Sequence, residues 1–134
     1  QDRTLGTAEQ LLAKQGLTDR VPVLVVPSCH PSLAGIVAGK LREKYERPVF
    51  VLTEDGEPGM LRGSGRSTEN YDMYAGLSAC GDLLIRFGGH RMAGGLTIAK
   101  ANVEQFRRRL EENCRLPLEE MGDVLHLDME LPLS

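Results

Sequence analysis

Residues 21–53 read VPVLVVPSCHPSLAGIVAGKLREKYERPVFVLT and contain a strand, a helix and a second strand in that order. The first run, Val21 to Pro27, is apolar on both faces, which predicts a buried strand of a parallel or mixed sheet. Pro31 is expected to begin the helix, because its missing N–H costs nothing there. Pro48 ends the helix and opens the second strand, Val49 to Thr53. A strand–helix–strand unit with short links predicts a right-handed crossover between parallel strands, and therefore an α/β fold.

Weaker patterns on either side of this unit complete the expected order of elements. A helix is expected before it, at residues 7–15. After it we expect a strand at 60–67, a helix at 71–84, a strand at 94–100 and a helix at 102–114. Asn102 is expected to cap the last helix, and Gly81 to interrupt the helix that begins at Tyr71. An alternating run at residues 124–131 predicts a further strand with no partner in the chain.

The composition is that of one globular domain of 134 residues, 41% of them hydrophobic and 26% charged. No apolar run approaches the roughly 20 residues of a membrane helix, so a soluble, cytoplasmic protein is expected. The cysteines Cys29, Cys80 and Cys114 are widely spaced, which favours buried thiols over a zinc site. The net charge of −3 argues against a general nucleic-acid coat. The first residue is not Met, which indicates a piece of a longer protein.

Two glycine-rich segments, RGSGRS at residues 62–67 and FGGHRMAGG at residues 87–95, both contain basic side chains. Glycine allows a ligand to approach the backbone closely, and the planar fork of arginine fits a phosphate group. We therefore expect two loops that together form one phosphate-recognition surface. Neither segment is a P-loop, because no GxxxxGK[ST] follows a strand.

Each candidate residue also has a structural interpretation. The 62–67 segment is equally compatible with a β-bulge or tight turn that carries surface arginines. His90 follows two glycines and suits a hydrogen bond to phosphate or acid–base chemistry, or else is a turn histidine without a ligand. His30 precedes a helix whose N-terminus attracts anions, or is simply a helix cap. The basic run at residues 107–109 is typical of a solvated helix face.

Four motifs, taken in order, resemble the DHH-associated domain of the RecJ family of single-strand-specific exonucleases. They are HPSLAGIVA at residues 30–38, RPVFVL at 47–52, GSGRS at 63–67, and FGGH at 87–90 with AGG at 93–95. Ser32 and Gly94 depart from the residues that the family usually has there, a glycine and an alanine. The resemblance extends over the chain as far as the helix that ends near Cys114.

The resemblance implies an α/β fold with a mixed central β-sheet and helices on both faces. It places the DHH-associated domain at residues 1–116, with an entering linker helix at 1–18. Residues 117–134 would begin the connection to an oligonucleotide-binding barrel.

The resemblance also implies a metal-dependent 5′–3′ exonuclease of single-stranded DNA. Mn²⁺ or Mg²⁺ would be held by a DHH domain elsewhere in the full-length chain, and no metal is expected in this one. The residues expected to act on the DNA are His90 as a catalytic residue, and Arg66, Ser64, Ser67, Gly65, Gly88, Gly89, Arg62 and His30 as substrate-binding residues.

Two other functions remain open at this point. Related DHH phosphodiesterases that degrade short oligonucleotides or cyclic dinucleotides have a similar glycine–histidine segment. The chain could also be a nucleic-acid binding module without catalytic activity. An upstream DHH motif would favour the enzymes, and a downstream barrel domain would favour the exonuclease.

Overall fold

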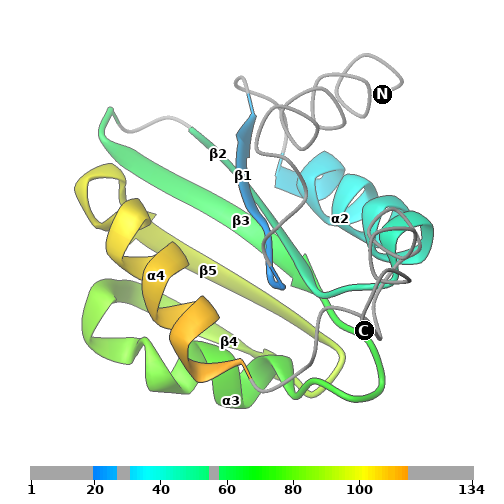
Figure 1. Ribbon diagram of the computed structural model, residues 1–134. Helices are drawn as coiled ribbons and strands as arrows, with labels where there is room; N and C mark the ends of the chain where they lie inside the picture. The colour runs from blue at the N-terminus through cyan, green and yellow to red at the C-terminus, as the bar shows by residue number, and fades with distance from the viewer. Residues whose placement is uncertain (1–19, 27–30, 55–57, 115–134) are drawn as a thin grey trace, which may run out of the picture.

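The computed structural model describes residues 20–26, 31–54 and 58–114 (Figure 1). The expected helix at residues 7–15, the tail strand at 124–131, Cys29 and His30 lie outside these residues. Within them, every helix is too short or too polar to span a lipid bilayer.

Five strands form a single mixed sheet in the order β1-β2-β3-β5-β4. The strands are β1 (Val23–Val26), β2 (Val49–Glu54), β3 (Met60–Arg66), β4 (Leu84–His90) and β5 (Ala93–Ala99). β1 and β2 are parallel, whereas β2–β3, β3–β5 and β5–β4 are antiparallel. The expected parallel pair and the expected mixed sheet are both confirmed.

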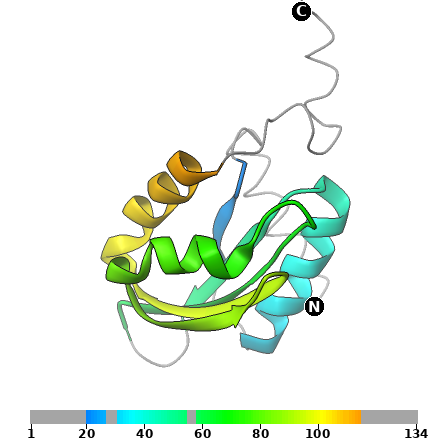
Figure 2. The same ribbon diagram turned by 90° about the horizontal axis from the view of Figure 1, so that it is seen from below.

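Helices cover both faces of the sheet, as predicted (Figure 2). Helix α2 (Pro31–Tyr45) packs on one face, over β2 and β3. Helices α3 (Met73–Ala79) and α4 (Val103–Asn113) pack on the other. Because side chains alternate along a strand, β2 contributes Val49 and Val51 to the α2 core and Phe50 and Leu52 to the α3–α4 core. Phe50 and Phe106 meet there edge to face, with ring centroids 5.3 Å apart.

The strand–helix–strand unit follows the sequence pattern closely. Pro31 is the first residue of α2, as expected. Three residues before Pro48, α2 ends at Tyr45, and Glu46 adopts a left-handed conformation with φ of 54°. The N–H of Glu46 donates to the carbonyl of Arg42 at 2.8 Å, which satisfies one of the free carbonyls at the helix end.

The later elements differ from expectation in three places. The strands expected at residues 60–67 and 94–100 are confirmed as β3 and β5, but β4 was not predicted, and the two glycine-rich segments, expected as ligand-binding loops, lie mostly within these three strands. The 71–84 helix is shorter than expected: α3 begins after Asp72, whose carboxylate accepts the N–H of Ala75, and a 3₁₀ turn follows at Gly81–Leu83. Asn102 precedes α4, but its side chain donates to the carbonyl of Leu83 at 3.2 Å instead of capping the helix.

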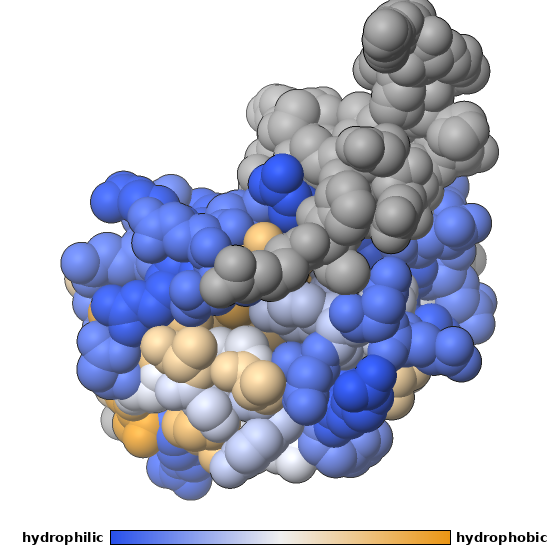
Figure 3. All heavy atoms as spheres, turned by 60° about the horizontal axis from the view of Figure 1, so that its bottom comes forward, coloured by the Kyte–Doolittle hydropathy of each residue, from blue (hydrophilic) through white to orange (hydrophobic). Residues whose placement is uncertain are grey.

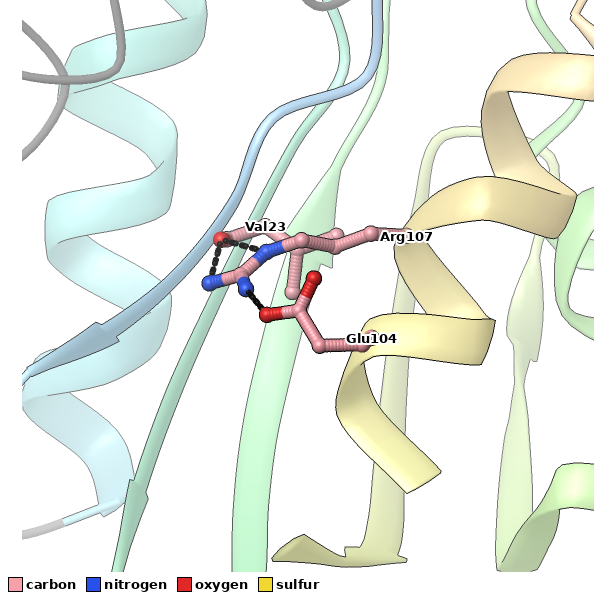
Figure 4. A network of polar contacts seen from close by, with 3 residues as sticks. All are labelled: Val23, Glu104 and Arg107. Atoms are coloured by element: carbon pink, nitrogen blue, oxygen red, sulfur yellow. Dashed lines mark hydrogen bonds and ion pairs between the residues drawn. The ribbon is translucent and has the colours of Figure 1, made fainter. Parts of the chain in front are cut away.

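Part of the basic run on α4 holds the helix against the sheet (Figure 4). Nε and Nη2 of Arg107 donate to the carbonyl of Val23 on β1, at 3.0 and 2.9 Å. Glu104, one turn earlier on α4, pairs with Nη1 of the same guanidinium. Arg109 pairs with Asp82 in the 3₁₀ turn. Arg107 and Arg109 therefore have structural roles and are half-buried, whereas Arg108 is exposed.

Replacing Arg107 with alanine is expected to lower the free energy of unfolding by about 1–3 kcal/mol, because a charged donor is removed from a strand carbonyl. Urea denaturation measures this change. Arg108→Ala is the control and should change stability by no more than about 0.5 kcal/mol. Equal effects of the two substitutions would show that the contact with Val23 does not stabilise the domain.

Candidate phosphate-binding face

The register of β3, β5 and β4 places nine residues in three rows that cross the strands on one face of the sheet. Residues paired across strands point to the same face, and so do residues two apart along a strand. The rows are the Arg62 row (Arg62, Thr97, Arg86), the Ser64 row (Ser64, Gly95, Gly88) and the Arg66 row (Arg66, Ala93, His90). We call this surface the open face. It is the face on which α2 packs, but α2 covers β2 and β3 and leaves β5 and β4 uncovered (Figure 2).

The Ser64 row forms a floor with almost no side chains. A Cβ atom on Gly88 would have no neighbour within 4 Å, and one on Gly95 would only touch the Gly63 carbonyl oxygen at 3.7 Å. A hollow of about 460 Å³ lies over this part of the sheet, and Ser64, Gly88 and Gly95 all line it. The glycines of the floor are therefore not required for packing at these two positions. They leave space above the backbone into which a ligand can enter.

Basic side chains occupy the four corners of the open face. Arg62 and Arg86 end one row, and Arg66 and His90 end another. Arg62, Arg86 and His90 are exposed, whereas Arg66 is half-buried. Among the described residues that line the hollow, none carries a carboxylate. A surface with basic corners and no acidic residue in the described lining of its hollow has the charge to attract an anion.

Helix α2 supports Arg66 from one side. A Cβ atom at Gly35 would lie 2.7 Å from Nη2 of Arg66 and 3.5 Å from the Ser64 hydroxyl, so the glycine leaves the room that the guanidinium occupies. Nη1 of Arg66 donates to the carbonyl of Gly65 at 2.8 Å. The guanidinium is thus held beside the helix, and its fixed fork can present its remaining N–H groups to a bidentate ligand.

A local hydrogen bond orients His90 at the hairpin between β4 and β5. Its Nδ1 accepts the N–H of Met92 at 3.3 Å, so the proton of the neutral ring is on Nε2. Gly89 has φ of 141°, and a Cβ atom there would lie 2.4 Å from the Ala93 carbonyl oxygen, so the hairpin requires glycine at that position. His90 is exposed, and its Nε2–H is available as a donor.

The other glycines of the two segments face the opposite side of the sheet. A Cβ atom would lie 2.6 Å from the Phe50 ring at Gly65, 2.3 Å from the Val51 carbonyl oxygen at Gly63, and 2.7 Å from Leu77 at Gly94. These three glycines allow the strands and α3 to approach closely. Successive residues of each glycine-rich motif therefore alternate between two roles. Every second residue packs against the core, and the residues between them form the open face.

The structure brings together only some of the predicted site residues. Arg62, Ser64, Arg66, Gly88 and His90 share the open face. Gly65 faces the core and Gly89 shapes the hairpin, so neither lines the floor.

Ser67 is fully buried, and its hydroxyl donates its one proton to the Tyr71 carbonyl at 2.6 Å, with the Thr68 carbonyl also within reach at 3.1 Å. The expectation that Ser67 contacts a ligand is corrected, because the hydroxyl is already bonded and inaccessible. His30 lies outside the described residues.

Four residues of the site were missed from the sequence: Gly35, Arg86, Gly95 and Thr97. The alternation of Arg86, Gly88 and His90 is the signal that could have identified β4 as a strand with one polar face. Gly35 and Gly39 are spaced one turn apart in α2, which favours close approach of the helix to the sheet.

The open face does not suit a divalent metal ion. Its side chains are arginine, histidine and hydroxyl groups, whereas Mg²⁺ and Mn²⁺ prefer carboxylate and carbonyl oxygens. Across the described ranges, no group of three His, Cys, Asp or Glu residues could hold a metal. Cys80 and Cys114 pack with the α3–α4 core, away from the open face. Burial raises the pKa of the Cys80 thiol to about 11.

The α3 side of the molecule has a different character. Apolar and weakly polar residues gather there between hydrophilic ones (Figure 3). Tyr74 on α3 is 46% exposed, and its ring lies 5.9 Å from that of Phe87. Arg109 of α4 donates to the Ala79 carbonyl at the end of α3 and is paired with Asp82. The set of basic corners around a glycine-rich floor is thus a feature of the open face.

Comparison with known proteins identifies the family. The DHHA1 domain model matches residues 18–116. RecJ of Bacillus subtilis, a single-stranded-DNA-specific exonuclease, is 39% identical over 105 residues. That match covers 78% of this chain and 13% of the relative, so the chain corresponds to a small part of the relative's length.

Solved structures agree with this result. RecJ of Thermus thermophilus in complex with Mg²⁺ has a TM-score of 0.68 and 32% identity, over 87% of this chain and 19% of that one. Exonuclease RecJ bound to manganese also has a TM-score of 0.68, with 30% identity, over 87% of this chain and 30% of that one. The expected resemblance and fold are confirmed. With its mixed sheet, its two glycine-rich motifs and a match over residues 18–116, the chain belongs to the DHHA1 domain family and is a RecJ-type DHH-associated domain.

Proposed function

We propose that this chain is the substrate-binding half of a 5′–3′ exonuclease specific for single-stranded DNA. In this role the open face holds phosphate groups of the DNA opposite a metal centre in a DHH domain of the same full-length chain. The enzyme would act in the cytoplasm, in DNA repair and recombination. The complete enzyme, not this chain alone, would hydrolyse the phosphodiester bond.

One observation carries the proposal: basic side chains surround a floor whose only side chain is the small hydroxymethyl group of Ser64. Arg66 and His90 end the same row of the sheet, on β3 and β4, with Ala93 between them on β5. A phosphate has several acceptor oxygens and can be bound from two sides at once. The open floor beside the row allows the rest of the nucleotide to approach the sheet closely.

The relatives support the choice of substrate. Those of Bacillus subtilis and Thermus thermophilus are named single-stranded-DNA-specific exonucleases. RecJ structures contain Mg²⁺ or manganese, and the open face lacks suitable ligands for either. We therefore assign the metal ion, which would supply Lewis-acid activation of water, to the DHH domain.

We assign different tasks to Arg66 and His90. Arg66, fixed beside Gly35 of α2 and bonded to the carbonyl of Gly65, would hold a phosphate through its planar fork, with the Ser64 hydroxyl beside it. His90 would donate from Nε2 to an oxygen of the scissile phosphate, because Nδ1 is occupied by the N–H of Met92. A donor directed at that oxygen stabilises the charge that develops there during hydrolysis.

Arg66→Ala in the complete enzyme is expected to lower kcat/KM on single-stranded DNA by about ten- to hundred-fold, because a charged hydrogen bond contributes about 1.5–3 kcal/mol. Arg66→Lys should recover only part of this loss, since a point charge lacks the fork. His90→Ala should lower kcat more than affinity for long DNA, because distant contacts still hold the strand. Single-turnover kinetics and DNA affinity measured without metal separate these effects.

Arg108→Ala removes an exposed arginine of α4 and is the matched control, with no expected effect on turnover. If Arg66→Ala and His90→Ala both behave like this control, the open face does not bind the substrate and the proposal is wrong. Faster hydrolysis of a cyclic dinucleotide than of long single-stranded DNA would instead favour a DHH-family phosphodiesterase.

A further inference from the structure

One of the three rows has no task in the function proposed above. The Arg62 row lies on the open face with the Arg66 row, on the other side of the floor. Arg62 and Arg86 are exposed at its two ends, and Thr97 is half-buried between them. All three residues line the hollow together with the floor residues. The hollow is thus bordered by a second group of phosphate-compatible side chains.

We infer that the Arg62 row is a second phosphate subsite, which binds another phosphate of the same single strand that the Arg66 row holds. The inference depends on the proposed function and extends it from one bound phosphate to the path of the strand. The strand would run along the direction of β3, β5 and β4 and would cross the floor formed by Ser64, Gly95 and Gly88.

The dimensions of the sheet suit this path. Rows two residues apart along a strand are separated by about 7 Å, so the two charged rows are about 13 Å apart. β3 and β4 lie on either side of β5, about 10 Å from each other. Long arginine side chains at the corners can therefore contact separate phosphates of one strand. Because Gly88 and Gly95 leave open space above the sheet, the backbone between those phosphates can lie close to the floor.

The side chains of the row have suitable chemistry. Within the part of the chain that the structure describes, no hydrogen bond or ion pair engages the guanidinium of Arg86, so its planar fork can donate to a phosphate without breaking an existing contact. The Thr97 hydroxyl is a donor between the two arginines. A different explanation is that Arg86 protects the edge strand β4 from pairing with another sheet. That role requires only a charge at the edge and predicts no effect on DNA affinity.

The test measures the affinity of the complete enzyme for two 5′-phosphorylated ligands, a thymidine dinucleotide and an oligothymidylate of about ten nucleotides, with EDTA to prevent cleavage. The variants of the Arg62 row are Arg86→Ala, Arg86→Gln and Arg62→Ala. Arg66→Ala represents the other row, and Arg108→Ala is the control for charge. In each variant of the Arg62 row, affinity for the longer ligand should fall about tenfold, while affinity for the dinucleotide stays within about twofold of that of the unchanged enzyme. The slope of log K against log salt should decrease by about 0.7 for each lost contact.

The outcomes separate this inference from the proposed function. If Arg66→Ala weakens binding of both ligands but all three Arg62-row variants behave like Arg108→Ala, the second subsite does not exist and the proposed function stands. If the Arg66 variant also behaves like the control, the proposed function fails as well. Equal losses for both ligands in the Arg86 variants would place both rows on one phosphate and overturn the inference. Thermal unfolding of Arg86→Gln confirms that the fold is retained, since Arg86 is exposed.

Discussion

Replacing Gly88 with leucine is expected to lower the activity of the complete enzyme on single-stranded DNA by about 100-fold while leaving the domain folded. A Cβ atom at Gly88 would have no neighbour within 4 Å, so the added side chain fits without disturbing the core. It would project from the floor into the hollow and displace the DNA from both charged rows. A displacement of about 1 Å in a bound substrate can cost a factor of about 100 in rate.

Ser78→Leu is the matched control for this experiment. Ser78 is exposed on α3, on the opposite side of the sheet, so the substitution adds the same side chain away from the open face. Thermal unfolding checks that both variants keep the stability of the unchanged protein. Full activity of a folded Gly88→Leu enzyme would show that DNA does not approach the floor, and would refute the open face as the binding surface.

The sequence predicts the α2 half of the fold well, because strong local signals agree there. β1 and β2 are rich in β-branched residues, and Pro31 and Pro48 mark the start of one element and the start of the next. The parallel pairing follows from the handedness of a short crossover. Local preference and tertiary packing favour the same structure in this part of the chain.

The glycine-rich half was predicted only in part: β3 and β5 were expected as strands, but β4 was not, because packing there overrides local preference. Glycine weakens a strand in isolation, yet β3, β4 and β5 pair throughout their glycine-rich parts, and the one irregularity lies between Leu84 and Arg86. At Gly65 and Gly94, glycine is what allows α3 and the Phe50 ring to lie against the sheet. Single-sequence patterns do not contain that information, since the partners are distant in the chain.

The expectation that both glycine-rich segments bind a ligand as loops also explains the errors in the site. In a loop, all neighbours of Arg66 could face a ligand, and Gly65 and Ser67 were therefore expected beside it. In a strand only every second residue faces one side. The structure accordingly turns Gly65 and Ser67 away from the open face and brings in Arg86, which the sequence did not single out. Most residues of the site were predictable from the sequence. Which residues of each strand face the open face and which face the core was not.

The same alternation predicts a severe loss of stability when Gly63 is replaced by alanine. A Cβ atom there would lie 2.3 Å from the Val51 carbonyl oxygen and 2.9 Å from the Leu52 Cα atom. Since both are backbone atoms of β2, relief requires the two central strands to move apart. We expect a loss of about 3 kcal/mol or more in the free energy of unfolding, which is a large part of the 5–15 kcal/mol typical of a domain.

Gly88→Ala is the control, since it makes the same substitution on the next strand but one. Its methyl group would point into open space. Because alanine makes the unfolded chain less flexible than glycine does, the free energy of unfolding should stay unchanged or rise by up to about 1 kcal/mol. Urea denaturation of both variants gives the comparison. If Gly63→Ala lowers the free energy of unfolding no more than Gly88→Ala does, β2 and β3 do not approach each other closely at Gly63. The division of each glycine-rich motif into a packed side and an open side would then lose its strongest support, because Gly63 lies directly beside Ser64 of the floor.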